Sequence, residues 1–341
     1  MEKRVATDPS ENSPITTTTY SDSPRLEHPD VTVIIVNFET SEYTRRCLAS
    51  LRQQELPVQT IVVDNPSPKN DAENLADLDD ILLVRNSENI GYGQACNRGF
   101  SYATADIVCI LNPDTVVPSG MLRAWLEKMK MECAKGVKVG ILAPSLLNEN
   151  GTRQRSTYGF PNFFNYWLHH SLLAGILKTL RKKFRIPTFR LFPWGNGIKE
   201  VPWVMGSAMM IPRSAWEAVG GFSNLFFLYA EDMDLCFRLR ACGYSILFDP
   251  SLEIIHTQGN PPAEKRDLAI RRLFDSLEIF LRAHYNRWQR IAVRSAVVLD
   301  MALRILLFSA VRLWRPHSTL TQKRLEGYHH ILRSYVRNLR R

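Results

Sequence analysis

The sequence lacks the patterns of redox, secreted and ATP-driven proteins. Its six cysteines include no C-x-x-C pair, which disfavours metal binding by cysteine and predicts reduced thiols in a cytosolic protein. It has no G-x-G-x-x-G fingerprint, no P-loop and no kinase-type lysine loop, so a hydride-transfer enzyme and an ATPase are disfavoured. Residues 1–30 are polar and contain no apolar run, so we expect a disordered segment without a secretory signal.

Positive charge is concentrated near the C-terminus. The 341-residue chain has a formal net charge of +9, and residues 261–341 contain 17 Lys and Arg against 6 Asp and Glu. The first 260 residues therefore have a net charge of about −2. Such a basic region is typical of proteins that bind nucleic acid or an anionic membrane surface, and these are the two candidate partners.

Short, β-branched apolar runs alternate with helix-like segments in the first part of the chain. The runs lie at 31–38, 60–65, 81–86 and 105–111. Their apolar character is typical of buried parallel strands, and the alternation with helices predicts a doubly wound α/β sheet. Asp64 lies near the end of the second run, and Asp114 follows the fourth. Ligands of open α/β sheets bind at this carboxyl edge of the strands.

Asp114 is a candidate metal ligand at that edge. A single carboxylate suits a hard divalent cation that takes its other oxygens from water and a diphosphate. The alternative is that Asp114 only begins a turn after Pro113. His256 follows the predicted strand 245–249, and it is either a structural residue or a further ligand at the same edge.

Three acidic residues, Glu231, Asp232 and Asp234, follow an apolar run at the beginning of a predicted helix that ends near Gly243. The helix dipole favours carboxylates there, and any one of them could simply cap the helix. Three acids exceed what capping requires. Apolar surroundings raise the pKa of a carboxylate toward the value that suits a general base, so this cluster is a candidate catalytic site.

Two segments favour contact with a membrane. Apolar and aromatic residues over 163–177 are followed by cations over 178–185, a pattern typical of either a lipid-headgroup interface or a helix packed on the domain. Residues 287–315 predict an amphipathic helix, with arginines in one arc and apolar residues facing away. The arginines are Arg287, Arg290, Arg294, Arg304, Arg312 and Arg315, and the apolar residues are Leu299, Leu303, Leu306, Leu313 and Trp314.

Charged residues interrupt this second segment too often for the roughly 20 apolar residues that a transmembrane helix needs. We therefore expect a helix that lies on an anionic membrane surface, with an oligomerisation or intramolecular helix as the alternative. Nucleic acid is disfavoured as a partner, because arginines that contact phosphates would not need an apolar opposite face.

Five segments resemble motifs of the family 2 glycosyltransferases and, within them, of the rhamnosyltransferase-like branch that extends bacterial surface polysaccharides. They are Val33–Phe38, Val62–Asn65, Asn89–Gly99, Leu111–Asp114 and Phe227–Cys236. Their order and spacing are specific to the family, and the resemblance covers residues 31–259. It implies a GT-A fold, a doubly wound mixed sheet flanked by helices, which binds a nucleotide-sugar and a divalent metal and transfers the sugar with inversion.

The resemblance also implies roles for individual residues. Asp114 would bind Mg²⁺ or Mn²⁺, and His256 would approach the metal or the diphosphate. Asp232 would be the base on the acceptor hydroxyl, with Glu231 beside it in the catalytic pair. Asp64 would hold the nucleobase. The residues that would bind the nucleotide-sugar are Asn37, Asp64, Asn65, Asn89, Gly91, Gly93, Asn97 and Asn112.

Two departures from the family pattern concern this site. Asn112 stands where the family's D-x-D motif has its first Asp, which leaves one carboxylate for the metal. Residues 66–70 replace the serine- and acid-rich turn that usually follows the nucleobase Asp, which affects the contacts to base and ribose.

The expected domain organisation has three parts. A disordered segment over 1–30 precedes a glycosyltransferase domain over 31–260, with a nucleotide-sugar-binding half at 31–118 and an acceptor half at 119–260. A basic, amphipathic helical tail over 261–341 would be a membrane-associating extension.

The expected function is inverting, metal-dependent transfer of a sugar from a nucleotide-sugar to a lipid-linked saccharide in cell-surface polysaccharide synthesis. dTDP-rhamnose is the favoured donor, with a UDP- or GDP-sugar as the alternative. The protein would be cytoplasmic and peripheral on the inner face of the cell membrane. Two other functions stay open: a sugar nucleotidyltransferase, although its Gly- and Arg-rich loop is missing after Val36, and a nucleotide-sugar-binding protein without transferase activity.

Overall fold

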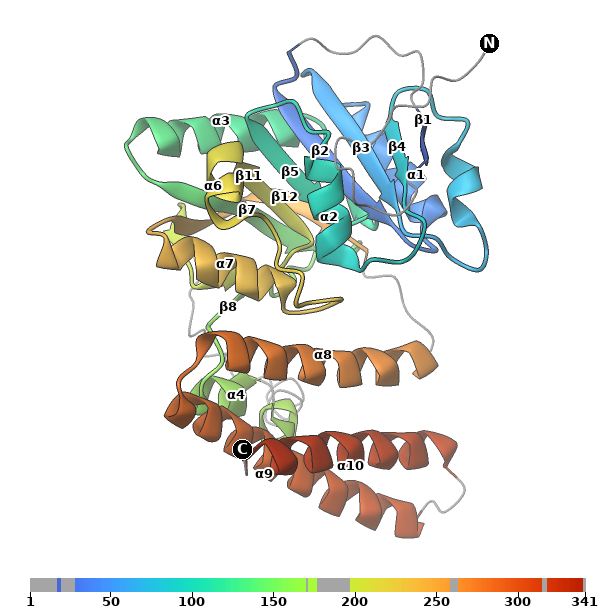
Figure 1. Cartoon of the computed structure of the whole chain (residues 1–341), viewed down its shortest axis with the longest axis vertical. Helices are drawn as coiled ribbons and strands as arrows, with labels where there is room; N and C mark the ends of the chain where they lie inside the picture. Colours follow the sequence, from blue (N-terminus) through green and yellow to red (C-terminus); the bar gives the residue numbers. More distant parts are fainter. Residues whose placement is uncertain are drawn as a thin grey trace. The chain divides into compact units, whose positions relative to one another are not determined.

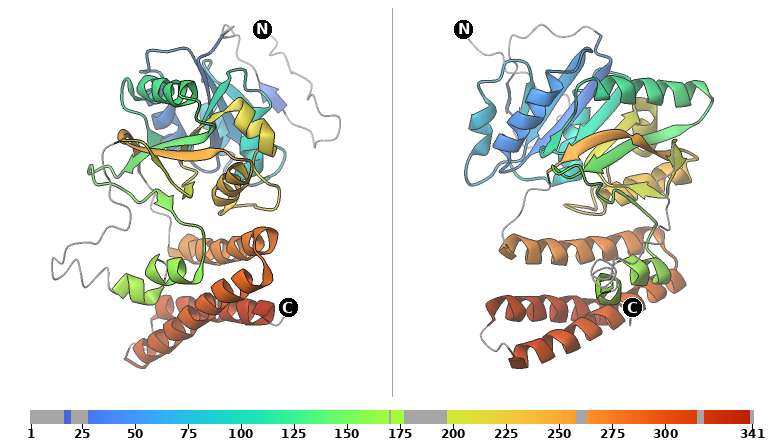
Figure 2. Two further views of the ribbon diagram at one scale, coloured as in Figure 1. Left: turned by 90° about the vertical axis from the view of Figure 1, so that its left-hand side faces the viewer. Right: turned by 180° about the vertical axis from the view of Figure 1, so that it is seen from behind.

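The computed structural model describes residues 17–19, 28–169, 171–176, 197–257, 263–314 and 318–339. The chain divides into two compact units. The first comprises residues 1–158 and 195–259 and is built on a β-sheet, as Figure 1 shows. The second comprises residues 159–194 and 260–341, and its described part is helical (Figure 2).

The described part of the first unit contains a ten-stranded sheet in the order β1-β4-β3-β2-β5-β11-β7-β12-β6, with β9 paired to β12. The strands are β1 (Thr17–Thr19), β2 (Val31–Asn37), β3 (Val58–Asp64), β4 (Leu82–Arg85), β5 (Ile107–Leu111), β6 (Thr115–Val116), β7 (Val139–Leu147), β9 (Lys199–Glu200), β11 (Ala208–Pro212) and β12 (Ser245–His256). β2 to β5 are parallel, whereas β11 lies antiparallel between β5 and β7. The predicted doubly wound, mixed α/β sheet is confirmed.

Helices cover both faces of this sheet because its central strands are apolar on both sides. α1 (Ser41–Leu51) and α3 (Met121–Ala134) share one core with Val33 and Ile35 of β2. α2 (Tyr92–Phe100) packs on the opposite face, where a Cβ added at Gly99 would lie 2.6 Å from Ile34 Cγ2. The unit also contains η1 (Asp71–Leu75), α6 (Arg213–Val219), α7 (Glu231–Ala241), and a small antiparallel pair of strands, β8 (Thr157–Tyr158) and β10 (Trp203–Val204).

The second unit packs its helices around buried aromatic and aliphatic side chains. The helices are α4 (Phe163–His169), α8 (Ala263–His284), α9 (Arg287–Trp314) and α10 (Thr319–Leu339). Asp300 on α9 is fully buried and accepts hydrogen bonds from Tyr166 Oη (3.0 Å), Leu172 N (2.6 Å) and Arg304 Nε (2.8 Å). No helix among the described residues is long and apolar enough to cross a membrane.

The sequence predicted six arginines in one arc of α9 that would face an anionic membrane. This prediction is wrong for two of them. Arg294 is buried, and its Nη2 lies 2.6 Å from Glu278 Oε1. Arg304 forms an ion pair with Asp300. Buried carboxylates need a paired cation, so these arginines face the interior of the unit. Leu306, Leu313 and the other predicted apolar residues of the helix are exposed.

The domain boundaries differ from the prediction in two respects. Residues 159–194 group with the C-terminal helices and not with the domain predicted over 31–260. Thr17–Thr19 forms strand β1 against the edge strand β4, so the predicted disorder over 1–30 is wrong for these residues. The other residues before His28, and the cations predicted over 178–185, lie outside the described residues.

Candidate active site

Asn37 and Asp64 end two adjacent parallel strands. The register of β2 and β3 places Asn37 opposite Asp64, and Asn37 Nδ2 donates a hydrogen bond of 2.7 Å to Asp64 Oδ1. Thr44 Oγ1 donates to Asn37 Oδ1 (2.9 Å), so the amide of this fully buried residue is held by its neighbours. The pKa of the Asp64 carboxyl is raised above its ordinary value, chiefly by burial. The Asn37 hydrogen bond and the Arg85 charge oppose part of this increase. Asn37 therefore positions Asp64.

Asn65, Asn89 and Gly91 form a hydrogen-bonded loop after these strands. Asn65 Nδ2 donates to Gly91 O (3.2 Å), and the Gly91 N–H donates to Asn89 Oδ1 (3.0 Å). Gly91 has φ +84°, and a Cβ added there would lie 2.4 Å from Phe227 O. Both its left-handed backbone and this close approach require glycine at position 91.

Gly93 and Asn97 on α2 contact the segment that precedes α7. A Cβ added at Gly93 would lie 3.0 Å from Phe222 Cβ. Asn97 Nδ2 donates to Phe222 O (2.8 Å), and Asn97 Oδ1 accepts from Phe222 N (2.9 Å). Two of the residues predicted to bind the nucleotide-sugar thus dock residues 222–230 on α2, and this docking places the N-terminus of α7.

Tyr229 and Ala230, immediately before α7, have left-handed backbone conformations with φ of 68° and 63°. For residues other than glycine such a conformation costs about 1–3 kcal/mol. A hydrogen bond of 3.0 Å from Tyr92 N to Phe227 O helps to hold this segment. Strained backbone of this kind concentrates at functional sites. The sequence carries no signal for it, because neither Tyr nor Ala is a typical turn residue.

Asp232 accepts two backbone hydrogen bonds at the N-terminus of α7. Gly206 N donates to Oδ2 (2.9 Å) and Met233 N donates to Oδ1 (2.8 Å). Burial raises the pKa of the Asp232 carboxyl, and these donors oppose the increase because they favour the anion.

Glu231 lies in a different environment from its neighbour. Its side chain is buried, and Oε2 has no hydrogen-bond partner in the described part of the chain. Burial, and then the charge of Asp232, raise the pKa of the Glu231 carboxyl. The two backbone donors favour the anion of Asp232, whereas burial without a hydrogen-bond partner on Oε2 favours the protonated form of Glu231.

Asp114 and His256 lie side by side at the carboxyl edge of the sheet. β12 pairs with β6 so that His256 is opposite Thr115, and Thr257 N donates to Asp114 O (2.9 Å). As a result, His256 Nε2 is 3.3 Å from Asp114 Oδ1.

Gln154 determines which ring nitrogen of His256 carries hydrogen. Gln154 Nε2 donates to His256 O (2.6 Å) and Asn148 Oδ1 (3.0 Å), so Gln154 Oε1 faces His256 Nδ1 at 2.9 Å. Nδ1 therefore carries the hydrogen, and in the neutral ring Nε2 presents its lone pair to the Asp114 carboxylate. His256 Nε2 and Asp114 Oδ1 are both atoms that can bind a divalent cation, and their separation of 3.3 Å suits two ligands of one metal ion.

Few protein side chains are available here as ligands for a metal ion. Among the described residues, no three His, Cys, Asp or Glu side chains converge in a way that could hold a metal ion. The pair of Asp114 and His256 would therefore leave most coordination positions to water and substrate oxygens, as Mg²⁺ sites at phosphates do.

Asn112 connects the end of β5, near Asp114, to the segment that contacts Asp232. Its N–H donates to Ser207 O (2.9 Å), and its Nδ2 donates to Ser207 Oγ (3.1 Å). Gly206, the neighbour of Ser207, donates to Asp232. Residues 206–207 thus link the end of β5 to the N-terminus of α7. The sequence prediction missed Gly206 and Gln154, because both act only through distant partners.

The chain is similar to known glycosyltransferases. Residues 32–193 match the family model described as "Glycosyl transferase family 2". The chain is 25% identical over 321 residues to the N-acetylglucosaminyl-diphospho-decaprenol L-rhamnosyltransferase of Mycobacterium tuberculosis, covering 87% of this chain and 98% of the relative. It is 26% identical over 236 residues to the rhamnosyltransferase WbbL of Escherichia coli, covering 66% and 83%. The solved structure of the mannosyltransferase PcManGT from Pyrobaculum calidifontis, in complex with GDP-Man and Mn²⁺, aligns with 92% of this chain and 88% of that chain at 16% identity and a TM-score of 0.49.

Proposed function

Because the chain belongs to glycosyltransferase family 2, we propose that it transfers a sugar, with rhamnose favoured, from a nucleotide-sugar to a saccharide carried on a lipid diphosphate. The two relatives are rhamnosyltransferases, and the name of one specifies a diphospho-decaprenol. dTDP-rhamnose is the favoured donor, with UDP- and GDP-sugars as alternatives. A sugar nucleotidyltransferase and a binding protein without activity are not favoured, because these relatives are enzymes that transfer a sugar.

This proposal rests chiefly on two acidic groups that residues 206–207 connect. One is Asp232 at the N-terminus of α7, and the other is Asp114 with His256 after β5. Inverting transfer needs a base beside the attacking hydroxyl and charge neutralisation at the leaving group on the opposite face of the anomeric carbon. Asp232 supplies the first and the pair of Asp114 and His256 supplies the second.

In the proposed reaction, Asp232 accepts the proton of the acceptor hydroxyl, whose oxygen forms the new bond to the anomeric carbon. The bond from that carbon to the nucleoside diphosphate breaks, and the diphosphate leaves with the electron pair. Mg²⁺ or Mn²⁺ held by Asp114 and His256 would neutralise its charge. Asp64 would bind the nucleobase, and Asn65, Asn89 and Gly91 would shape the loop beside the donor.

Calorimetric titration with dTDP, UDP and GDP, with and without Mn²⁺, tests the donor site. Asp114→Ala is compared with Asp106→Ala, a variant of an exposed acid just before the opposite end of β5. We expect metal-dependent binding of one nucleotide, its loss in the first variant and its retention in the second. Failure of the wild type to bind any of the three nucleotides would overturn the proposal.

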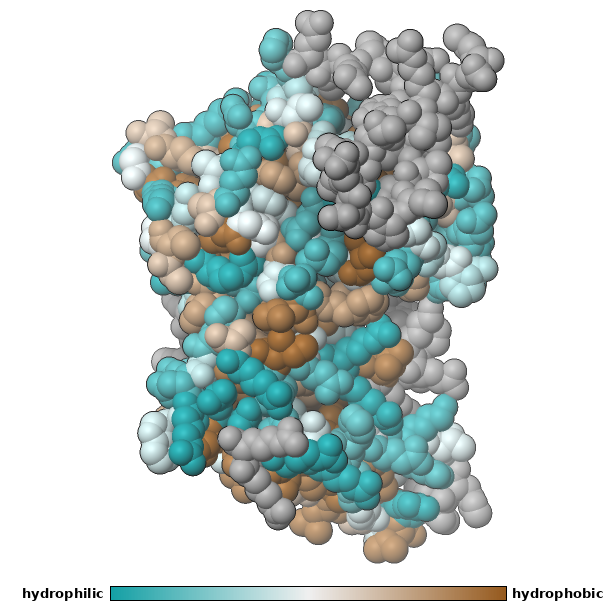
Figure 3. Space-filling model, in the orientation of Figure 1, coloured by the Kyte–Doolittle hydropathy of each residue, from teal (hydrophilic) through white to brown (hydrophobic). Residues whose placement is uncertain are grey.

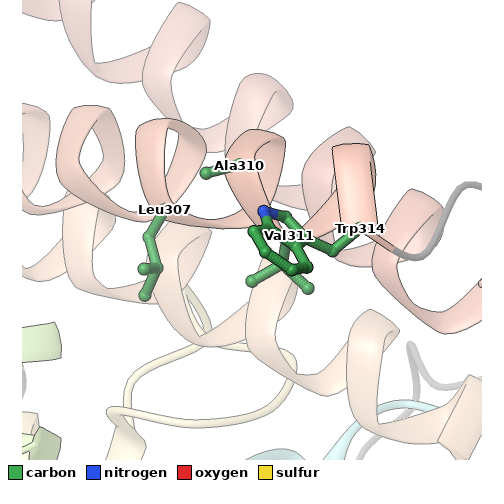
Figure 4. Close-up of a pocket in the computed structure, with 4 residues that line it drawn as sticks. All are labelled: Leu307, Ala310, Val311 and Trp314. Carbon is green, nitrogen blue, oxygen red and sulfur yellow. The ribbon is translucent and has the colours of Figure 1, made fainter.

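We also propose that α9 holds the enzyme on the inner face of the cell membrane. Leu306, Leu313 and Trp314 are 71%, 84% and 89% exposed. Figure 4 shows an apolar surface pocket on the same helix, lined by Leu307, Ala310, Val311 and Trp314. Figure 3 shows apolar residues on the surface of the second unit, to which α9 belongs. Leucine and tryptophan side chains beside the exposed Arg312 suit an anionic bilayer, into which they would insert while cations meet the headgroups.

A further inference from the structure

Arg85 lies beside Asp64 at the carboxyl edge of the sheet, and the proposed reaction assigns it no role. The register of β3 and β4 places Asp64 opposite Arg85, just as the register of β2 and β3 places Asn37 opposite Asp64. Residues that are opposite each other on neighbouring strands project from the same face of a sheet. Three polar side chains therefore form one row across the ends of β2, β3 and β4.

Asp64 and Arg85 both have hydrogen-bonding atoms that the described protein does not use. Asp64 Oδ1 accepts from Asn37, whereas Oδ2 accepts no hydrogen bond from the described residues. Among the same residues, the Arg85 side chain donates only from Nη1, to Glu73 Oε1, and its Nε has no partner. A guanidinium has five N–H donors, and this side chain is 26% exposed, so Arg85 can still donate to a ligand.

The carboxylate of Asp64 and the guanidinium of Arg85 are neighbours that do not pair with each other. Within the described chain, the ion pair of Arg85 is with Glu73 on η1 and not with Asp64. Burial raises the pKa of Asp64 and the Arg85 charge lowers it, so the guanidinium is close enough to act on the carboxyl. An acceptor and a donor at neighbouring positions suit a ligand that offers an N–H group beside a carbonyl oxygen.

Nucleobases differ at this type of edge. Thymine, uracil and guanine have a ring N–H next to a carbonyl oxygen. Cytosine and adenine instead have a ring nitrogen without hydrogen next to an amino group. A carboxylate and a guanidinium side by side therefore match the first three bases, which we call the keto bases, and mismatch the other two.

We propose that Arg85 acts with Asp64 to select a keto base in the donor nucleotide, an inference that rests on the proposed transferase function. Asp64 Oδ2 would accept from the ring N–H, and Arg85 would donate to the adjacent carbonyl oxygen. With cytosine or adenine, Arg85 would face an amino group and Asp64 a lone pair, so both hydrogen bonds would be lost. Arg85 is thus a specificity-determining residue of the donor site.

Calorimetric titration of the full chain with paired nucleotides in the presence of Mn²⁺ tests this inference. The pairs are UDP with CDP, dTDP with dCDP, and GDP with ADP. The wild type should bind the keto member of at least one pair about tenfold or more tightly than its amino counterpart. Inorganic pyrophosphate with Mn²⁺ is the probe without a base, and its binding shows that each variant is folded.

Four variants separate base recognition from a structural role of Arg85. Arg85→Met should reduce the keto preference about tenfold and leave pyrophosphate binding unchanged. Arg85→Lys, the second variant at this position, should also reduce it, because an ammonium lacks the planar set of donors. Glu73→Gln breaks the ion pair but keeps the guanidinium, so the preference should stay. Arg52→Met removes an arginine that pairs with Asp80, just before the opposite end of β4, and should change nothing.

The outcomes distinguish this inference from the proposed function. Equal binding of keto and amino nucleotides by the wild type would overturn base selection. So would a preference that both Arg85 variants retain, or one that Glu73→Gln abolishes, since Arg85 would then act only through its ion pair. Each of these results leaves nucleotide binding in place and the transferase proposal standing. A wild type that binds none of the keto nucleotides would overturn the proposed function itself.

Discussion

At the scale of single residues, Glu231 combines deep burial, an unpartnered oxygen and a raised pKa. As pH rises above 4.5, the ordinary pKa of glutamate, the unfolded chain loses this proton while the folded chain keeps it. The free energy of unfolding contributed by this group therefore falls with rising pH until the raised pKa is passed. Glu231→Gln has no proton to lose, so its stability advantage over the wild type should grow with pH.

Urea unfolding of Glu231→Gln and wild type at several pH values between about 5 and 9 measures this difference. An advantage of about 1–3 kcal/mol at the upper end is expected, because the wild type must then ionise a buried carboxyl and glutamine has no proton to lose. A constant difference across the range would show that Glu231 is not protonated in the folded chain.

Asp232 provides the second prediction at this scale. Asp232→Asn keeps the side-chain shape but cannot accept the hydroxyl proton, so kcat should fall by about 10²–10⁴. Binding of nucleotide with Mn²⁺ should stay at the wild-type level, because the proposed donor residues do not include Asp232 and lie on the other side of residues 206–207. Transfer at the normal rate by this variant would assign the base elsewhere. Asp234 is not an alternative, because it is paired with Arg238.

At the scale of elements, the contact between α2 and the segment before α7 depends on Gly91. Gly91 and Gly136 have nearly equal φ values, +84° and +83°, but a Cβ would meet Phe227 O at 2.4 Å in the first case and open space in the second. Gly136→Ala should therefore cost only about 1 kcal/mol, and Gly91→Ala clearly more than about 2 kcal/mol. Thermal unfolding of both variants measures the difference, and equal losses would mean that the close approach relaxes freely.

Asp300 provides a prediction for the helical elements of the second unit. Asp300→Ala leaves Arg304, Tyr166 Oη and the Leu172 N–H without their acceptor, at a cost of about 3–5 kcal/mol. Hydrogen exchange should show loss of protection in α4 and α9 while β2 and β3 stay protected. Asp275→Ala, an exposed acid of the same unit, is the control and should leave the exchange pattern unchanged.

At the scale of the whole molecule, membrane binding by α9 predicts a response to charge on its exposed face. Leu306→Glu combined with Leu313→Glu should reduce flotation with phosphatidylglycerol vesicles at least tenfold, because each buried leucine contributes about 1.5–3 kcal/mol. Met131→Glu changes a 47% exposed side chain on α3 of the first unit and serves as control. If the double variant and the control float equally, the membrane face lies elsewhere.

The sequence predicted where the parallel strands lie along the chain and which acidic residues follow them. Such predictions depend on short-range periodicity, since a β-branched run followed by Asn37, Asp64 or Asp114 places that residue at the carboxyl edge whatever its partners are. The resemblance to the family likewise depended on local motifs. The pairing of Asp114 with His256 was also expected, and the structure places the two side chains 3.3 Å apart.

Only the tertiary structure decided which partner each polar side chain has. Gly93 and Asn97, which were predicted to bind the donor, also contact Phe222, whereas Arg294 and Arg304 were expected on the surface but pair with buried acids. These choices depend on contacts between segments far apart in the chain, where burial makes an unpaired charge costly. The sequence by itself thus determined the sheet edge and the acids along it, whereas long-range packing decided which of the polar residues hold the fold and which stay available for chemistry.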